Sequence, residues 1–211
     1  MNHHVTIIDY GMGNLLSVYR ALEHIGSSIT MSSDPAVIKK AKRLILPGVG
    51  AFGDGMAGLK KRGLVDVILE QSLNDIPLLG ICLGAQMLLD TSEEFGRHNG
   101  LGLIPGEVRA IPVTNTDNQP LRIPNVGWSD LHTAHNHPLL DALPANSAMY
   151  FVHSYQCQLR DSSSLIGHCD FGGHSITAMF GHEQITGCQF HPEKSGAAGL
   201  HILRNFIEGK T

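Results

Sequence analysis

The chain contains 211 residues, of which 42% are hydrophobic and 16% are charged, and its formal net charge is −4. This composition fits one domain with a substantial core, and we predict a single domain over residues 1–211. The sequence has no basic block that would indicate nucleic acid or an anionic membrane as a partner, and no apolar run approaches the roughly 20 residues of a transmembrane helix. Residues 1–5 do not resemble a secretory signal, so we expect a cytoplasmic protein.

The first part of the chain alternates between predicted strands and predicted helices. Apolar runs predict strands over residues 4–9, 29–33, 43–46 and 76–81. Helical signals lie between them: Asn14 can cap a helix that ends before Gly26, Asp34 and Pro35 begin a short helix to about residue 42, and residues 54–74 have a helical pattern that breaks at Gly63. This order predicts an α/β fold with a mostly parallel central sheet and helices on both faces.

The chain between Gly100 and Gln189 has a different character, because proline, glycine, asparagine and serine interrupt short β-rich runs. The runs cover residues 108–113, 149–158, 165–168 and 175–180, and we expect them to add antiparallel strands. Residues 114–120 are polar and have no periodicity, which predicts a mobile loop. From Gly196 onwards, the spacing of Leu200, Leu203 and Phe206 predicts a final amphipathic helix.

The most informative motif is Gly80-Ile-Cys-Leu-Gly-Ala-Gln86, where a continuous apolar strand gives way to a helical pattern. Such a strand-to-helix turn exposes the Cys82 side chain at the corner, and the first N–H groups of the helix point towards whatever the thiol attacks. The helix N-terminus also favours the thiolate. A cysteine considered alone is more often a buried apolar side chain. In this setting we interpret Cys82 as a nucleophile and the Leu83 N–H as a donor to an oxyanion.

A second motif, Gln189-Phe-His-Pro-Glu193, places a histidine and a glutamate two residues apart at the end of an extended run. Alternate positions of an extended segment share a face, and Pro192 keeps His191 out of the helical region. We therefore expect both side chains to stay on an extended segment and to converge on one pocket. His191 would take the thiol proton, while Glu193 would fix its tautomer and support the imidazolium. Together the two motifs predict a triad of Cys82, His191 and Glu193.

Metal or cofactor chemistry finds little support in the sequence. The four cysteines, at positions 82, 157, 169 and 188, form no close pairs, and the thirteen histidines lack the paired spacing of a zinc site. A reducing compartment would leave these cysteines as thiols. There is no Walker A motif, and Leu16 stands where a dinucleotide fingerprint needs its third glycine. We predict an enzyme with no metal and no cofactor.

Five segments along the chain resemble those of the class I glutamine amidotransferases, and specifically the glutaminase subunits of imidazole glycerol phosphate synthase. They are Asp9-Tyr-Gly-Met-Gly-Asn-Leu15, Leu46-Pro-Gly-Val-Gly-Ala-Phe-Gly53, Gly80-Ile-Cys-Leu-Gly-Ala-Gln86, Tyr150-Phe-Val-His-Ser-Tyr155 and Gln189-Phe-His-Pro-Glu-Lys-Ser-Gly-Ala-Ala-Gly199. The resemblance implies the flavodoxin-like fold of the class. It also implies glutamine as the substrate, and a thioester on Cys82 as the intermediate that yields glutamate and ammonia.

Further site residues are suggested by position and by the resemblance. The glycine-rich loop at residues 48–50 can be positioned to offer a second oxyanion donor, from Val49 or Gly50. Gln86 falls one helical turn after Cys82 and can face the same pocket. The resemblance also suggests Ser154 and Tyr155, in the Val-His-Ser-Tyr stretch, as residues that bind glutamine. The candidates for glutamine binding are therefore Gly48, Gln86, Ser154 and Tyr155.

The resemblance implies a separate partner, because the family passes ammonia directly to a synthase subunit and nothing in this chain looks like that subunit. The implied partner is a (β/α)8-barrel cyclase of histidine biosynthesis, forming a heterodimer with the glutaminase. Asn14, Trp128 and Lys194 are the weaker candidates for the partner interface. We expect low glutaminase activity when the partner is absent.

Other functions stay open at this point. The residues around Trp128 and after Tyr155 differ from those usual in the resembling subunit, which leaves a paralogue that supplies ammonia to another synthase, for example one modifying surface-polysaccharide sugars. The glutaminase of pyridoxal phosphate synthase fits less well, because no Gly-Gly-Glu-Ser segment replaces Pro-Gly-Val-Gly. A cysteine hydrolase of the same fold would share the elbow but not the His-Pro-Glu motif. A non-catalytic binding subunit would not need the intact Cys, His and Glu.

Overall fold

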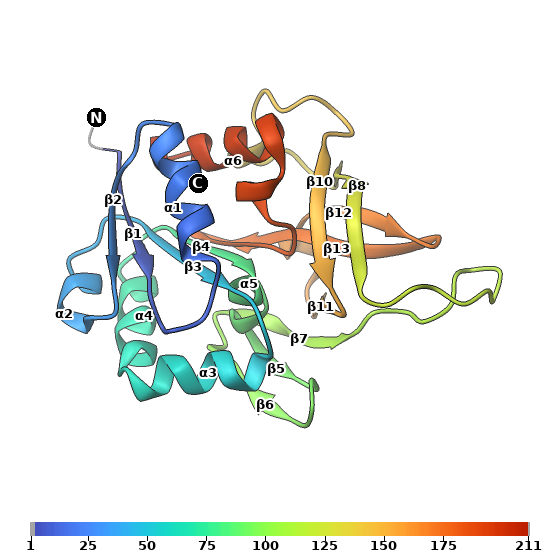
Figure 1. The fold of residues 1–211 in the computed structure, drawn as a ribbon, viewed down its shortest axis with the longest axis horizontal. Helices are drawn as coiled ribbons and strands as arrows, with labels where there is room; N and C mark the ends of the chain where they lie inside the picture. The colour runs from blue at the N-terminus through green and yellow to red at the C-terminus, as the bar shows by residue number, and fades with distance from the viewer. Residues whose placement is uncertain (1–2, 211) are drawn as a thin grey trace.

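An eight-stranded sheet forms the centre of the molecule in the computed structural model, which describes residues 3–210 (Figure 1). The strands lie in the order β2 (Ser28–Ser32), β1 (His4–Ile8), β3 (Leu44–Gly48), β4 (Leu78–Cys82), β14 (Ile185–Cys188), β13 (His174–His182), β12 (Leu165–Phe171) and β9 (His132–Thr133). The first five run parallel, and the last three continue the sheet with antiparallel pairing. The predicted α/β fold is confirmed. Residues 1, 2 and 211 lie outside the described residues. Two predictions involve them: the character of the N-terminal segment, and the placing of the domain limits at residues 1 and 211.

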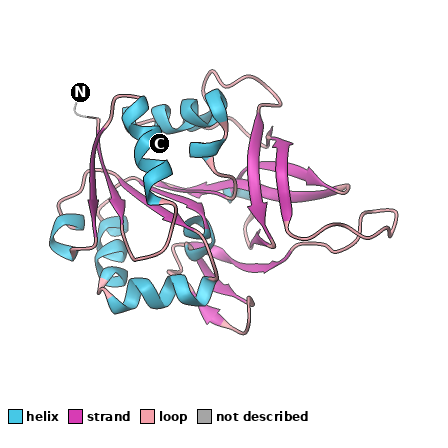
Figure 2. Ribbon diagram, viewed as in Figure 1, coloured by secondary structure: helices cyan, strands magenta, loops and turns pink. Residues whose placement is uncertain are grey.

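Helices cover both faces of this sheet (Figures 1 and 2). On one face lie α1 (Leu15–His24) and α6 (Gly196–Glu208), and on the other lie α3 (Phe52–Lys61), α4 (Leu64–Leu73) and α5 (Leu83–Met87), with the short α2 (Pro35–Ile38) beside α4. A hydrophobic core lies on each face of the sheet, and successive side chains of a strand point alternately into one core and the other. Ile45 packs in the core under α1 and α6, and its neighbours Leu44 and Leu46 pack in the core under α3 and α4.

The parallel strands bring the ends of β3 and β4 together. Gly48 pairs with Cys82 in the sheet register, so the loop after β3 starts beside the cysteine. The sequence predicted that this strand ends at residue 46, but it continues through Pro47 and Gly48. Proline is tolerated there because the ladder between β3 and β1 stops at Ile45, so that side of β3 has no strand partner at Pro47.

Two smaller sheets project from the central one. The first pairs β10 (Ala148–His153) with β8 (Asn125–Asp130), and the second has the order β11 (Tyr155–Leu159), β7 (Ile104–Ala110), β5 (Leu89–Ser92) and β6 (His98–Asn99). Short 3-10 turns lie at η1 (Pro138–Leu140), η2 (Ser162–Ser164) and η3 (Pro192–Lys194). Among the described residues, no helix has both the length and the apolar character to cross a membrane.

Several predicted details of the first half differ from the structure. Asn14 precedes α1, but its side chain makes no capping hydrogen bond. Asp34 does cap α2, with its carboxylate accepting from the Ala36 N–H over 2.8 Å, yet that helix ends at Ile38 because the chain must turn to begin β3 at Leu44. The predicted break in the long helical segment is confirmed: α3 and α4 are separated at Gly63, whose φ of 66° suits glycine.

The second half differs more, because its strands are set by pairing rather than by local pattern. The predicted strand at residues 149–158 is two strands, β10 and β11, which part at Ser154 where the chain passes from one small sheet to the other. The predicted strand at residues 108–113 is β7, which starts and ends earlier because it pairs with both β5 and β11. Residues 114–120 form a turn closed by a bridge between Thr114 and Pro120.

Candidate active site

Cys82 lies at the corner between β4 and α5, as the sequence predicted. Its φ of 53° and ψ of −111° are unfavourable for a residue with a Cβ, which is the kind of backbone strain found at functional sites. Tight packing holds the corner in this shape. A Cβ at Gly84 would collide with the carbonyl oxygen of Leu46, and a Cβ at Gly80 would lie 2.8 Å from the Cα of Ala85. The two glycines therefore let α5 start directly against the neighbouring strand.

His191 and Glu193 meet after the end of β14. The His191 Nδ1 donates to Oε1 of Glu193 over 2.8 Å, and both side chains are almost completely buried. The backbone differs from the expected extended segment, because Pro192 is the first residue of η3 and Glu193 lies within that turn. The predicted convergence nevertheless holds, since a tight turn also brings side chains two positions apart together. The His191 N–H donates to the Tyr150 carbonyl over 2.9 Å, which ties this segment to β10.

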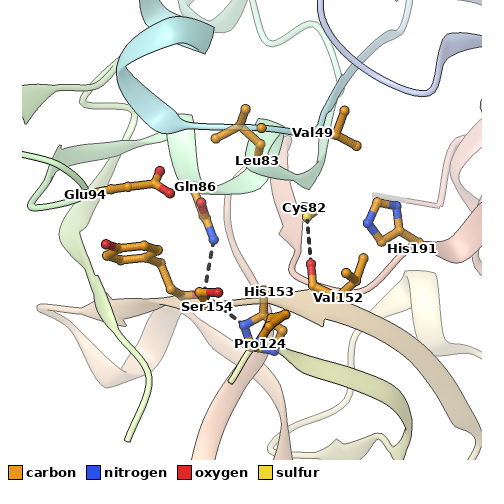
Figure 3. A pocket seen from close by; sticks show the side chains of 12 residues that line it. Val49, Cys82, Leu83, Gln86, Glu94, Pro124, Val152, His153, Ser154 and His191 are labelled. Carbon is orange, nitrogen blue, oxygen red and sulfur yellow. Dashed lines mark hydrogen bonds between the residues drawn. The ribbon is translucent and has the colours of Figure 1, made fainter. Parts of the chain in front are cut away.

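The Cys82 thiol lies beside His191 at one end of a pocket (Figure 3). The His191 Nε2 is buried and makes no hydrogen bond of standard geometry to any described residue. The sulfur has two weak contacts of its own: it donates to the Val152 carbonyl over 3.9 Å and accepts from Nε2 of Gln189 over 3.8 Å. Nε2 is thus the nitrogen left available for a proton exchanged with the thiol or with a substrate.

The electrostatics of this group favour a charged imidazole. Burial by itself lowers the pKa of His191, but the adjacent Cys82 and Glu193 side chains outweigh burial and raise that pKa to about 9. A histidine with this pKa is protonated at neutral pH. The arrangement therefore provides a proton donor next to the thiol, with a carboxylate behind the imidazole to hold its orientation.

The pocket has a volume of about 270 Å³, which suits a ligand smaller than a typical drug molecule, such as a free amino acid. It is lined by Val49, Gly50, Cys82, Leu83, Gln86, Glu94, Pro124, Val152, His153, Ser154, Tyr155 and His191. The structure thus brings together most of the residues singled out in the sequence. Gly48 lies behind the pocket and does not line it: a Cβ there would come within 2.8 Å of the Gly84 nitrogen, so the lack of a side chain serves close packing.

A family model of class-I glutamine amidotransferases matches residues 6–209. The chain belongs to the class-I glutamine amidotransferase family. Among curated proteins, imidazole glycerol phosphate synthase subunit HisH 1 of Legionella pneumophila (strain Lens) is 44% identical over 209 residues, covering 97% of this chain and 98% of the relative. Subunit HisH of Sulfurimonas denitrificans is 46% identical over 204 residues, covering 97% of both.

Solved structures share the fold of this amidotransferase. A crystal structure described as a glutamine amidotransferase has a TM-score of 0.74 with 17% identity and covers 97% of each chain. The structure of PurLQS from Thermotoga maritima has a TM-score of 0.72 with 19% identity, covering 99% of this chain and 98% of the other. At such identities the likeness establishes the fold alone.

The amidotransferase pocket contains residues that the sequence did not single out. Glu94, from the loop between β5 and β6, lies at the opposite end from His191 (Figure 3). His153 lies in the wall, where its Nδ1 donates to the Tyr155 carbonyl over 2.8 Å and its Nε2 accepts from the Asn125 amide over 3.0 Å. Burial is the main reason that the pKa of His153 falls to about 4, so this ring is neutral.

The local sequence gives different signals for these two residues. His153 stands within the Val-His-Ser-Tyr stretch, and that stretch is the signal that could have identified it. Glu94 stands beside another glutamate in a polar turn, and nothing local distinguishes it from a solvated surface charge. Only the pairing of β5 with β7 and the packing of the turn against α3 carry it to the pocket.

The candidate interface residues divide into two groups. The Trp128 ring lies edge-on to the Tyr150 ring with centroids 5.8 Å apart, and the Lys194 ammonium is 6.0 Å from the same Tyr150 centroid. Trp128 is 57% exposed, so a large part of this aromatic residue is accessible to a partner. Asn14 is on a different element, at the start of α1.

Proposed function

We propose that this amidotransferase is the glutaminase subunit of imidazole glycerol phosphate synthase, acting as one domain. The observation that carries the proposal is the identity of 44–46% with subunits of that name over nearly the whole length of both chains. The active-site geometry supports it independently, because a strained cysteine lies beside a buried histidine that donates a hydrogen bond to a buried glutamate. Four free cysteines among the described residues are in keeping with the reducing conditions of the cytoplasm, where we place the protein.

In the proposed reaction, the Cys82 thiolate attacks the side-chain amide carbon of glutamine to form a tetrahedral intermediate. When that intermediate collapses, the carbon–nitrogen bond breaks, His191 protonates the departing nitrogen, and ammonia leaves behind a thioester on Cys82. A water molecule then attacks the thioester, His191 accepts one of its protons, and the bond to sulfur breaks to give glutamate and the free cysteine. Glu193 keeps the imidazole oriented and supports its charge in each step.

The oxyanion of both tetrahedral intermediates needs hydrogen-bond donors. We assign one to the backbone N–H of Leu83, the first residue of α5, because the first N–H groups of a helix have no partner within it. The second donor is an N–H of the loop at Val49 and Gly50, which borders the pocket on the same side. Gly50 has a φ of 97°, so the loop adopts a conformation that a residue with a side chain resists.

The substrate's amino-acid portion would occupy the end of the pocket away from His191. Glu94 offers a carboxylate to the α-ammonium group, while Ser154 and Tyr155 border the same space. The Gln86 amide donates to the Tyr155 carbonyl over 3.2 Å and to Oε1 of Gln189 over 3.0 Å. We therefore assign Gln86 an indirect role. It holds Tyr155 in the pocket wall, and it holds Gln189, whose amide contacts the Cys82 sulfur.

The proposed partner is a separate (β/α)8-barrel cyclase, which would receive ammonia before water protonates it. We propose that it docks over the aromatic cluster of Trp128, Tyr150 and Lys194, together with Asn14. This surface presents an exposed tryptophan packed against a tyrosine, and both residue types are enriched at the centres of protein interfaces. Tyr150 also connects it to the active site, since the Tyr150 carbonyl accepts the N–H of His191.

The experiment that tests the proposal measures glutamate release by the chain alone, with the cyclase, and with the cyclase and its nucleotide ligand. We expect weak release by the chain alone and strong stimulation by the liganded complex. Full turnover by the isolated chain, unchanged by the cyclase, would contradict the proposal. Stimulation by another barrel synthase instead would identify the paralogous amidotransferase, and hydrolysis of peptides but not glutamine would identify a cysteine hydrolase of this fold.

A further inference from the structure

The loop that borders the catalytic cysteine is short and fixed at both ends. Residues 49–51, here called the oxyanion loop, connect Gly48, which pairs with Cys82 in the sheet, to Phe52, which is the first residue of α3. The Phe52 side chain is completely buried. With so few residues between its two anchors, the direction of the N–H groups in this loop depends on how firmly the start of α3 is held.

The start of α3 lacks the usual local cap. Ala51 occupies the N-cap position and has no side-chain oxygen to accept from the first N–H groups of the helix. Glu94 supplies the missing acceptor from another part of the chain: its Oε2 accepts the Phe52 N–H over 2.6 Å. A carboxylate at this position also interacts favourably with the positive end of the helix dipole.

Glu94 is itself held on a braced turn. Its N–H donates to the hydroxyl of Ser92, which is almost fully buried, over 3.1 Å. Ser92 pairs with His98 across the β5–β6 hairpin, and the His98 ring packs beside Phe52 with centroids 6.5 Å apart. No ion pair joins Glu94 to a lysine or arginine in the part of the chain that the structure describes.

We infer that Glu94 is a positioning residue for the oxyanion loop: by accepting the Phe52 N–H it fixes the start of α3, and with it the loop that carries the second proposed oxyanion donor. This inference rests on the proposed function and deepens it. A carboxylate has two oxygens, so Oε2 can cap α3 while Oε1 faces the pocket and the substrate ammonium. One side chain then sets both the place of the substrate and the place of its oxyanion donors.

The two parts played by Glu94 are separable by substitution. Glu94→Gln keeps an oxygen acceptor of the same reach for Phe52 but removes the charge that attracts an ammonium group. Glu94→Ala removes both. Ala51→Ser in the Glu94→Ala background adds a local N-cap acceptor, for which there is room because Ala51 borders a cavity of about 280 Å³. The matched control is Glu93→Ala, which removes the neighbouring carboxylate of the same turn.

Steady-state glutaminase assays on the liganded synthase complex give the first readout. We expect Glu94→Gln to raise KM while kcat stays within about threefold of wild type. Glu94→Ala should lower kcat by a further factor of about 10, a partial form of the roughly 10²–10³ lost with a whole oxyanion donor. The added Ala51→Ser should restore kcat but not KM. Equal kcat values for Glu94→Ala and Glu94→Gln would overturn the inference.

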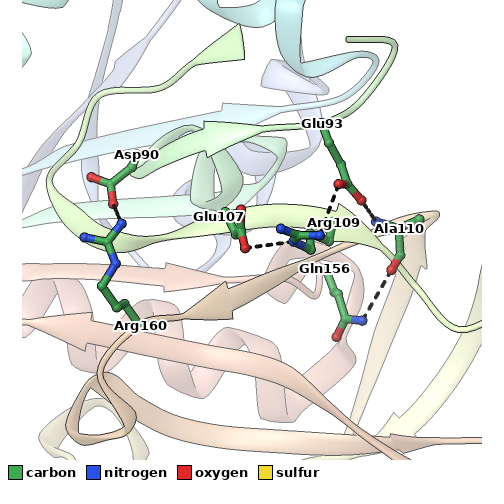
Figure 4. A network of polar contacts seen from close by, with 7 residues as sticks. All are labelled: Asp90, Glu93, Glu107, Arg109, Ala110, Gln156 and Arg160. Atoms are coloured by element: carbon green, nitrogen blue, oxygen red, sulfur yellow. Dashed lines mark hydrogen bonds and ion pairs between the residues drawn. The ribbon is translucent and has the colours of Figure 1, made fainter. Parts of the chain in front are cut away.

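Amide hydrogen exchange of residues 49–53 gives a second readout that requires no activity. Faster exchange is expected in Glu94→Ala, with protection retained in Glu94→Gln and recovered by Ala51→Ser. Glu93→Ala should leave this exchange unchanged, because the Glu93 carboxylate accepts from the Ala110 N–H and pairs with Arg109 on the side of the small sheet (Figure 4). Unchanged exchange in Glu94→Ala would refute the positioning role of Glu94. Absence of glutamine turnover in the wild type as well as in all variants would instead refute the proposed function and leave the exchange result standing.

Discussion

Nδ1 of His191 donates a hydrogen bond to Oε1 of Glu193 over 2.8 Å, and neither side chain has appreciable contact with solvent. The carboxylate therefore acts on the imidazole without competition from water, which makes its charge effective. The same contact fixes which ring nitrogen faces Cys82. The chemistry proposed for His191 thus depends on Glu193, although Glu193 does not line the substrate pocket.

Glu193→Gln tests this dependence. We expect kcat for glutamine to fall by about 10²–10⁴, because a neutral amide cannot support the imidazolium and no longer selects the tautomer. Steady-state glutamate release measures the effect, and a thermal melt checks that the variant is folded. Glu183→Gln changes an exposed glutamate on the turn between β13 and β14 and serves as control. A Glu193→Gln enzyme with near-normal kcat would refute the part assigned to this carboxylate.

The strained backbone of Cys82 predicts an unusual order of stability in two inactive variants. Glycine in place of alanine usually destabilises a folded protein, but at a φ of 53° and a ψ of −111° glycine avoids the strain that alanine retains. We therefore expect Cys82→Gly to exceed Cys82→Ala in free energy of unfolding by roughly 1 kcal/mol. Urea denaturation of both proteins measures the difference. The opposite order would show that the corner is not strained in solution.

The parts of the fold that follow local patterns were predictable from the sequence. The parallel strands and their helices carry their own periodicity, and the helix break at Gly63 and the cysteine corner follow from single residues with clear conformational preferences. Strand pairing in the second half was not predictable in this way. The predicted strand divides at Ser154 because the residues before it pair in one small sheet and the residues after it pair in the other. No local sequence signal indicates this change of sheet.

The candidate site shows the same division between local and distant causes. Cys82, His191 and Glu193 stand in compact motifs whose spacing already suggests their chemistry. Glu94 reaches the pocket only because its turn packs against α3, and its cap on Phe52 joins positions that are 42 residues apart. Such a contact depends on the tertiary structure and leaves no trace in the residues next to either partner.

The raised pKa of His191 makes stability depend on pH. The ordinary histidine value of 6.5 rises to about 9 in the folded protein, so the folded state holds its proton more tightly than the unfolded state does. The resulting stabilisation is complete below about pH 6.5 and is lost as the pH rises through about 9. Over this window we expect wild type to lose on the order of 3 kcal/mol relative to His191→Gln. Denaturation curves between pH 6 and 9.5 measure this, and parallel pH profiles for the two proteins would contradict it.

Exposure of Trp128 predicts that its side chain contributes strongly to partner binding. Large aromatic side chains at the centre of an interface commonly contribute about 2 kcal/mol or more, so Trp128→Ala should weaken binding to the cyclase by roughly 30-fold or more. Leu73 provides the matched control: it is 85% exposed at the end of α4, which lies on the other side of the central sheet from α1 and α6 (Figure 1). Titration calorimetry with the cyclase measures both.

The two variants also separate docking from catalysis. Because the Tyr150 ring packs against Trp128 while its carbonyl holds the His191 segment, Trp128→Ala should also reduce the stimulation of glutaminase at saturating cyclase. Leu73→Ala should leave affinity and stimulation unchanged, since it removes similar exposed apolar surface from a face that we do not assign to the partner. Equal losses of affinity in both variants would mean that exposed hydrophobic surface in general accounts for binding, and not the aromatic cluster. The proposed docking surface would then be wrong.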